Sequence, residues 1–241
     1  MRLIEQVSLI GSTNAALLAR LAAGERVPEG HWLIADRQDQ GKGRQGRAWF
    51  DGRGNFMGST AVHLKSGDPD APTLALLAGI SLVEVIGQII PPPSRPMLKW
   101  PNDVLVGGAK LAGILLERSG DSVVIGIGVN LAAAPDLPDR PTIALSAMMP
   151  APDRDVFAAQ LATMLAQDLD RWRTYGLAPV ITRWTAAAHP LGTALAVGEP
   201  GEVPLHGSFA GLDESGALLL LLPDGTKRAI HAGEIRLADG N

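Results

Sequence analysis

The 241-residue chain contains no cysteine, and this absence removes several kinds of chemistry at once. Without cysteine the chain forms no disulfide, no thiolate metal site and no cysteine nucleophile. Any catalytic group must therefore be another side chain.

The chain also lacks an excess of positive charge and a long hydrophobic run. Its formal net charge is -4, so it does not have the overall basicity typical of general nucleic-acid-binding proteins. The N-terminal sequence MRLIEQVSLIGSTN has polar residues where a signal peptide needs an apolar stretch, and no segment contains about 18 consecutive apolar residues. These features predict a cytoplasmic protein that does not associate with membranes.

Hydrophobic spacing and turn residues divide the chain into helices and strands. Helices are predicted over 15–23, from Pro72 to the prolines at 91–93, around 157–172 and over 179–188. Short apolar runs predict strands: HWLIA, residues 54–64, MLKW, DVLV, KLAGILLE and SVVIGIGVNL. The last four are so closely spaced that antiparallel neighbours are favoured over helical crossovers.

The pattern changes after His189 and Pro190. From there the chain has only short strand-like segments separated by glycine-rich turns, such as TALAV, VPLHGSFAGL, ALLLLL and KRAIHAGEIRL. We predict a first domain over residues 1–189 and a small β-barrel over residues 190–241.

One loop concentrates glycine and positive charge in this acidic chain. Its sequence, DRQDQGKGRQGRAWF, spans residues 36–50. The glycines let the backbone approach a ligand, and Lys42, Arg44 and Arg47 are suited to a carboxylate or phosphate. The spacing matches neither a P-loop nor, in this context, the dinucleotide-binding fingerprint. A solvent-exposed basic loop is the alternative interpretation.

A second segment, KWPNDVLVGGAKLAGILLE, spans residues 99–117. Its Pro-Asn-Asp sequence is common in tight turns, which is the alternative to a functional role for Asn102 and Asp103. Lys110 lies within an apolar strand, where an ammonium group needs an anionic partner or a path to solvent. A snorkelling lysine on an edge strand is the alternative for this residue.

Two shorter motifs carry weaker signals. Ser12, Thr13 and Asn14 precede a helix, where serine and threonine usually act as caps, although a helix N-terminus can also present polar donors to a ligand. The segment GIGVN is a glycine-containing strand that ends at the polar residue Asn130.

In this order and spacing, STN, QDQGKGRQGRAW, KWPNDV with KLAGILLE, and GIGVN resemble the biotin protein ligases over nearly the whole chain. The resemblance implies an α/β (α+β) catalytic domain related to class II aminoacyl-tRNA synthetases. Its mixed, largely antiparallel sheet would be flanked by helices and followed by a small C-terminal β-barrel. It also implies that ATP and Mg²⁺ are used to convert biotin to biotinyl-5′-AMP, whose biotinyl group is then transferred to a lysine of a biotin carboxyl carrier domain of an acyl-CoA carboxylase.

The same resemblance assigns roles to residues. The catalytic residues would be Lys110, Arg44 and Lys42. Those that bind biotin would be Ser12, Thr13, Asn14, Gln38, Lys42, Gly43, Arg44 and Lys110. Those that bind ATP would be Trp49, Lys99, Asn102 and Asn130. Asp103 is the candidate for an indirect magnesium ligand.

Two departures from the family bear on these roles. Lys42 stands where the family most often has arginine, so the charge is kept but the planar, bidentate geometry of guanidinium is not. Some members also carry an N-terminal helix-turn-helix that binds operator DNA. Because STN begins at residue 12, we expect this chain not to bind operator DNA.

Two other functions remain open. A lipoate or octanoate transferase would share the fold, and a non-catalytic biotin sensor would share the ligand site, although its cationic residues would have no reaction to serve. An exposed edge of the sheet is compatible with a homodimer. We also expect residues 36–50 to fold over biotinyl-AMP as a lid, because a mixed anhydride must be protected from water.

Overall fold

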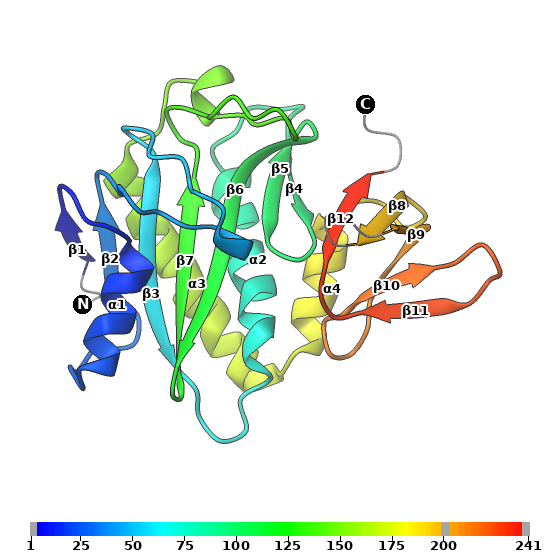
Figure 1. Cartoon of the computed structure of the whole chain (residues 1–241), viewed down its shortest axis with the longest axis horizontal. Helices are drawn as coiled ribbons and strands as arrows, with labels where there is room; N and C mark the ends of the chain where they lie inside the picture. The colour runs from blue at the N-terminus through cyan, green and yellow to red at the C-terminus, as the bar shows by residue number, and fades with distance from the viewer. Residues whose placement is uncertain (1–3, 199–202, 238–241) are drawn as a thin grey trace.

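The computed structural model describes residues 4–198 and 203–237, which contain a seven-stranded and a five-stranded sheet (Figure 1). The larger sheet has the order β1-β2-β3-β7-β6-β5-β4. Only β1 and β2 run parallel, so the predicted mixed, largely antiparallel sheet is confirmed. Its strands are β1 (Ile4–Val7), β2 (Trp32–Ala35), β3 (Phe56–His63), β4 (Pro96–Lys99), β5 (Asp103–Val106), β6 (Ala109–Ser119) and β7 (Ser122–Val129).

Helices cover the two faces of this sheet unequally. Strand alternation directs Leu33 of β2 into a small core with Leu17 of α1, while its neighbours Trp32 and Ile34 enter the main core. One face is therefore packed mainly against helices, and the other keeps room for a ligand beside α1. The helices are α1 (Thr13–Ala22), α2 (Leu74–Gly87), α3 (Arg154–Tyr175) and α4 (Ala178–Ala187), which confirms the predicted ones with small shifts of their ends.

The C-terminal sheet is open, so the predicted barrel is wrong. Its order is β11-β10-β9-β8-β12, and β11 and β12 do not pair with each other in the part of the chain that the structure describes. Most of β11 is exposed, including Lys227 and Arg228, so it has no apolar face that closure would bury. The strands are β8 (Ala194–Gly198), β9 (Leu205–Leu212), β10 (Leu218–Leu221), β11 (Lys227–Ile230) and β12 (Glu234–Leu237).

The two sheets are held together by aromatic side chains. The ring of Trp184 in α4 meets that of Phe209 in β9 edge-on, with 6.4 Å between centroids. Trp100, which follows β4, donates from Nε1 to the carbonyl of Gly216 at 3.3 Å. These contacts bring β12 beside the turn between β4 and β5.

Among the described helices, none has the length and hydrophobicity needed to span a membrane.

Candidate functional site

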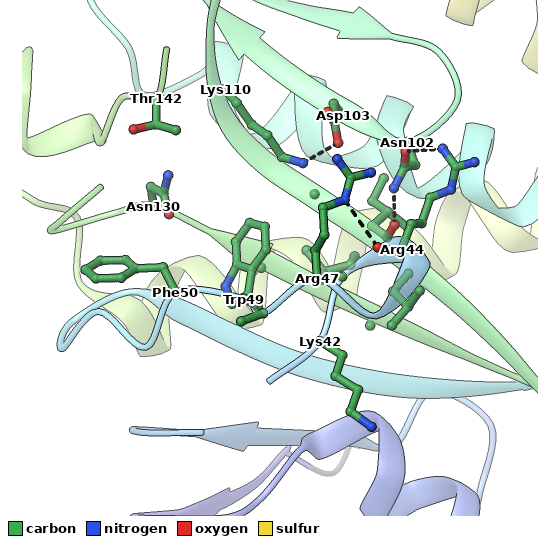
Figure 2. A pocket seen from close by; sticks show the side chains of 18 of the residues that line it. Lys42, Arg44, Arg47, Trp49, Phe50, Asn102, Asp103, Lys110, Asn130 and Thr142 are labelled. Carbon is green, nitrogen blue, oxygen red and sulfur yellow. Dashed lines mark hydrogen bonds and ion pairs between the residues drawn. The ribbon is translucent and has the colours of Figure 1, made fainter. Parts of the chain in front are cut away.

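A cavity of about 450 Å³ lies between the glycine-rich loop and the face of the large sheet that carries α1 (Figure 2). The loop, the first turn of α1, strands β3, β6 and β7, the turn after β4 and strand β12 all contribute to its walls. Every site residue that the sequence predicted lines this one cavity: Ser12, Thr13, Asn14, Gln38, Lys42, Gly43, Arg44, Trp49, Lys99, Asn102, Asp103, Lys110 and Asn130. Their individual roles stay predictions.

Glycines in the floor of the cavity make room for two of these side chains. A Cβ atom on Gly126 would lie 2.3 Å from Asn14 Oδ1, and one on Gly128 would lie 2.2 Å from the Trp49 ring. Gly113 pairs with Gly128 across the sheet, and its Cβ would lie 3.0 Å from the same ring. The glycines of GIGVN therefore let Asn14 and Trp49 lie close to the sheet.

One end of the cavity is a buried chain of hydrogen bonds. The backbone N–H of Thr13 donates to Gln38 Oε1 at 2.6 Å, and Thr13 Oγ1 lies 3.0 Å from the same oxygen. Thr13 Oγ1 is also 2.7 Å from Ser59 Oγ, which donates to Asn14 Oδ1 at 2.6 Å. Ser12 is the N-cap of α1 and accepts from the backbone of Ala15. The STN motif therefore both caps the helix and presents polar groups to the cavity.

The centre of the cavity contains two lysines and one carboxylate. Lys110 Nζ forms an ion pair with Asp103 Oδ1 at 2.6 Å and lies 5.7 Å from the centroid of the Trp49 ring. Lys99 lies opposite Asp103 in the register of the antiparallel strands β4 and β5. Burial lowers the pKa of Lys99, and the negative charge of Asp103 partly offsets this. Lys110 thus has the anionic partner that its apolar strand requires, and Asp103 is engaged with that lysine.

The cations of the loop do not all converge. Arg44 donates to Asn102 Oδ1 at 3.3 Å and to the carbonyl of Gly233 at 3.4 Å. The exposed Lys42 side chain points away from Arg44 and Lys110, toward the opposite side of the cavity (Figure 2). The resemblance implied that residues 42–44 span the biotin carboxylate and the phosphate, and in the structure the charged ends of Lys42 and Arg44 point in different directions (Figure 2).

Strand β12 adds residues that the sequence did not reveal. Glu234 forms an ion pair with Arg47, and both line the cavity. Burial lowers the pKa of Arg47, and the positive charge of Arg140 lowers it further. Because Glu234 lies in the C-terminal sheet, far along the chain from the loop, no local pattern connects it to Arg47. Ser59 was also missed, although a buried hydroxyl within the apolar run of β3 is a detectable signal.

The other end of the cavity contains an unused hydrogen-bond acceptor. Asn130 follows β7 and donates from Nδ2 to the carbonyl of Ile143 at 3.2 Å. Its Oδ1 is buried and has no hydrogen-bond partner among the described residues, and the same is true of Trp49 Nε1. A buried acceptor without a partner is unfavourable unless a ligand supplies a donor.

Within residues 4–198 and 203–237, no cluster of three or more acidic or histidine side chains is arranged to hold a metal ion.

Comparison with known proteins gives a consistent family. Residues 8–130 match the biotin/lipoate A/B protein ligase family, and residues 196–237 match the biotin protein ligase C-terminal domain. The chain is 38% identical to the biotin–acetyl-CoA-carboxylase ligase of Paracoccus denitrificans, over 93% of this chain and 96% of that protein. It is 35% identical to the bifunctional ligase/repressor BirA of Escherichia coli, over 95% of this chain and 72% of that protein.

A solved structure extends this similarity to the fold. The biotin protein ligase from Aquifex aeolicus in complex with biotin and ATP superposes with a TM-score of 0.85 at 26% identity. The match covers 98% of this chain and 99% of that chain. The similarity therefore includes both sheets.

Proposed function

The chain belongs to the biotin/lipoate A/B protein ligase family, and we propose that it activates biotin with ATP and transfers the biotinyl group to a lysine of a biotin carboxyl carrier domain. The observation that carries this proposal is the composition of one cavity. A chain of hydrogen-bonding groups at one end, cations at the centre and an unused acceptor beside Trp49 at the other end fit the three parts of biotinyl-AMP.

The polar end favours biotin over an octanoyl or lipoyl group. The ureido ring of biotin has two N–H groups and a carbonyl, which can pair with Thr13, Ser59 and Gln38. An octanoyl or lipoyl group carries no such polar groups at its distal end. Its binding would leave without a partner those donor and acceptor sites of the polar chain that the chain does not itself use, at a cost of about 1–3 kcal/mol for each site that is buried.

At the opposite end, Asn130 Oδ1 would accept a hydrogen bond from the adenine 6-amino group. The Nδ2 group of Asn130 already donates to Ile143, so the side chain is held with its oxygen available. Trp49 lies between this group and Lys110 and would pack against the nucleotide.

In the first half-reaction, a carboxylate oxygen of biotin attacks the α-phosphorus of ATP, and the bond from that phosphorus to pyrophosphate breaks. Both reactants are negative, so Lys110, Lys99 and Arg44 would offset their repulsion and hold them in line. Mg²⁺ would be held by the nucleotide phosphates, with Asp103 as the candidate for an indirect ligand, and would reduce the negative charge that the biotin carboxylate approaches.

In the second half-reaction, the neutral amine of the acceptor lysine attacks the carbonyl carbon of biotinyl-AMP. The bond to AMP breaks and the nitrogen loses a proton, which leaves an amide. We propose an acyl-CoA carboxylase carrier domain as the acceptor, since relatives are named as ligases of acetyl-CoA carboxylase.

The experiment that tests the proposal has two stages. The protein is first incubated with biotin and labelled ATP, and release of pyrophosphate is measured. A purified carrier domain is then added, and incorporation of biotin is followed by mass spectrometry. Octanoate and lipoate in place of biotin test the transferase alternative. A biotin sensor without catalytic activity would bind biotin but release no pyrophosphate.

A further inference from the structure

Glu117 lies at the end of the polar chain, outside the cavity. It is a partly buried residue of β6, and its Oε2 accepts a hydrogen bond from Asn14 Nδ2 at 2.8 Å. Asn14 is buried with 4% of its surface exposed and lines the cavity, whereas Glu117 does not line it. Glu117 can therefore influence a ligand only through Asn14.

We propose that Glu117 is a positioning residue that fixes the direction of the hydrogen bonds from Thr13 through Ser59 to Asn14, and thereby selects a ligand with N–H donors. This inference rests on the proposed function, in which that ligand is the ureido ring of biotin. It concerns a residue that touches neither substrate.

The carboxylate of Glu117 sets the orientation of the Asn14 amide. An ionised carboxylate can only accept hydrogen bonds, so the Asn14 group that faces Glu117 must be the amide nitrogen. The amide oxygen is then turned toward Ser59 Oγ, at 2.6 Å. A neutral amide in place of Glu117 would remove this constraint, because it can offer either an oxygen or an N–H group to Asn14.

The hydroxyl groups of Thr13 and Ser59 have one hydrogen each to donate. Asn14 Oδ1 can only accept, so it takes the single hydroxyl hydrogen of Ser59. The single hydroxyl hydrogen of Thr13 goes either to Ser59 Oγ or to Gln38 Oε1, at 2.7 and 3.0 Å. Both hydroxyl hydrogens are thus used inside the chain, and Thr13 and Ser59 have only lone pairs left for a ligand.

Gln38 adds a donor at this end of the cavity. Its Oε1 accepts the backbone N–H of Thr13 at 2.6 Å, so its Nε2 remains as a donor beside the hydroxyl lone pairs. The hydroxyl lone pairs of Thr13 and Ser59 can accept from two ligand N–H groups, and Gln38 Nε2 can donate to a ligand carbonyl. A cyclic urea has two N–H groups next to one carbonyl and therefore complements these residues. If the Asn14 amide turned over, its Nδ2 group would donate to Ser59 Oγ and would occupy a lone pair that a ligand N–H could otherwise use. The Ser59 hydroxyl hydrogen would then turn toward Thr13 Oγ1, which would lose a lone pair in the same way.

The variant Glu117→Gln tests this direction with almost no change in shape. Biotin affinity is measured by calorimetric titration, and the Michaelis constant for ATP is measured by pyrophosphate release. We expect biotin binding to weaken by about 3-fold to 10-fold, because only a fraction of the molecules then keep the orientation of Asn14 that suits biotin, while the ATP constant changes by less than about twofold. Glu84→Gln, which removes a carboxylate paired with Arg183 in the helical layer, is the matched control.

A charge swap provides the second variant. In Glu117→Gln with Asn14→Asp, the new carboxylate at position 14 can accept from both Ser59 and the new amide, so the original direction returns. We expect this double variant to recover most of the biotin affinity that Glu117→Gln loses.

Each outcome is decisive. Unchanged biotin affinity in Glu117→Gln, an equal loss toward ATP, or no recovery in the double variant would overturn the positioning role. If the wild-type protein gives no heat with biotin, the proposed function itself fails, and this inference fails with it.

Discussion

Lys110 Nζ lies 2.6 Å from Asp103 Oδ1, and the two side chains come from neighbouring strands at the centre of the cavity. Both side chains are largely shielded from solvent, with 19% and 14% of their surface exposed. The ammonium group therefore has an internal partner before any ligand carboxylate arrives. Its contributions to stability and to catalysis must be separated by experiment.

Lys110→Met keeps much of the length of the side chain and removes the charge. We expect it to slow adenylation by about 100-fold, because a cation is lost from the reacting centre. We also expect the free energy of unfolding to fall by about 1–3 kcal/mol, because Asp103 is left without its partner. Pyrophosphate release and denaturant unfolding measure the two effects.

The double variant Lys110→Met with Asp103→Asn separates the effect on adenylation from the effect on stability. The single variant Asp103→Asn is the control. Removing the unpaired carboxylate should restore most of the lost stability but should not restore adenylation. If the double variant regained adenylation as well, Lys110 would serve only to neutralise Asp103.

The same ion pair shows how far sequence reasoning reaches. A lysine in an apolar strand predicted an anionic partner or a path to solvent for Lys110, and the family resemblance favoured the carboxylate of biotin as that partner. The sequence could not decide between an internal carboxylate and a ligand carboxylate, because both satisfy a buried ammonium group equally well. Pairing of β5 with β6 brings Asp103 within reach of Lys110, through a register that includes a bulge between Val104 and Leu105.

Arg44 and Lys42 form a second contrast. Arg44 uses two nitrogens of its guanidinium group on Asn102 and Gly233, whereas Lys42 is exposed and points away from them. Arg44→Lys should therefore weaken ATP or biotin binding by about 10-fold, since a lysine cannot make both contacts. Lys42→Arg should stay within about threefold of the wild type, because neither charge nor an internal contact is lost.

Calorimetric titration with biotin, together with the kinetics of pyrophosphate release, compares these two variants directly. A larger effect from Lys42→Arg than from Arg44→Lys would show that the loop rearranges around Lys42 when ligand binds.

Gly126 and Gly128 allow the two ends of the cavity to be tested separately. Both lie on the same side of β7, and a methyl group would meet Asn14 at one position and Trp49 at the other. Gly126→Ala should therefore weaken biotin binding by at least about 10-fold with little effect on ATP. Gly128→Ala should raise the Michaelis constant for ATP by a similar factor. Equal effects on both substrates from either variant would contradict this division of the cavity.

These glycines also mark a limit of sequence reasoning. A glycine in a strand indicates a close approach, but it does not say what approaches. Asn14 and Trp49 reach β7 from two different segments, and only the packed structure brings them there. The barrel prediction failed for a related reason, since a run of short strands does not determine whether the first and last of them pair.

The ion pair between Arg47 and Glu234 connects the glycine-rich loop to the C-terminal sheet. The loop is also closed on itself, because Gly43 donates its N–H to the carbonyl of Arg47 at 2.7 Å, and Gln45 takes a left-handed conformation with φ of 56°. Glu234→Gln removes the charge from the ion pair between this turn and β12, and leaves the hydrogen bond from Arg44 to the carbonyl of Gly233 in place. We expect faster hydrogen exchange of residues 41–49 in the absence of ligand and unchanged exchange in the core strands.

Ligand charge should compensate for this loss. Biotinyl-AMP brings a phosphate to which Arg44 and Arg47 can bind, so the loop of the Glu234→Gln protein should regain protection when the adenylate is present. Hydrogen exchange with and without the adenylate, in the wild type and in the variant, measures the effect. Glu214→Gln, in the C-terminal segment between β9 and β10, is the matched control and should leave exchange of the loop unchanged. Equal exchange of residues 41–49 in wild type and Glu234→Gln without ligand would show that β12 does not hold the loop, and equal protection with and without adenylate would contradict the lid.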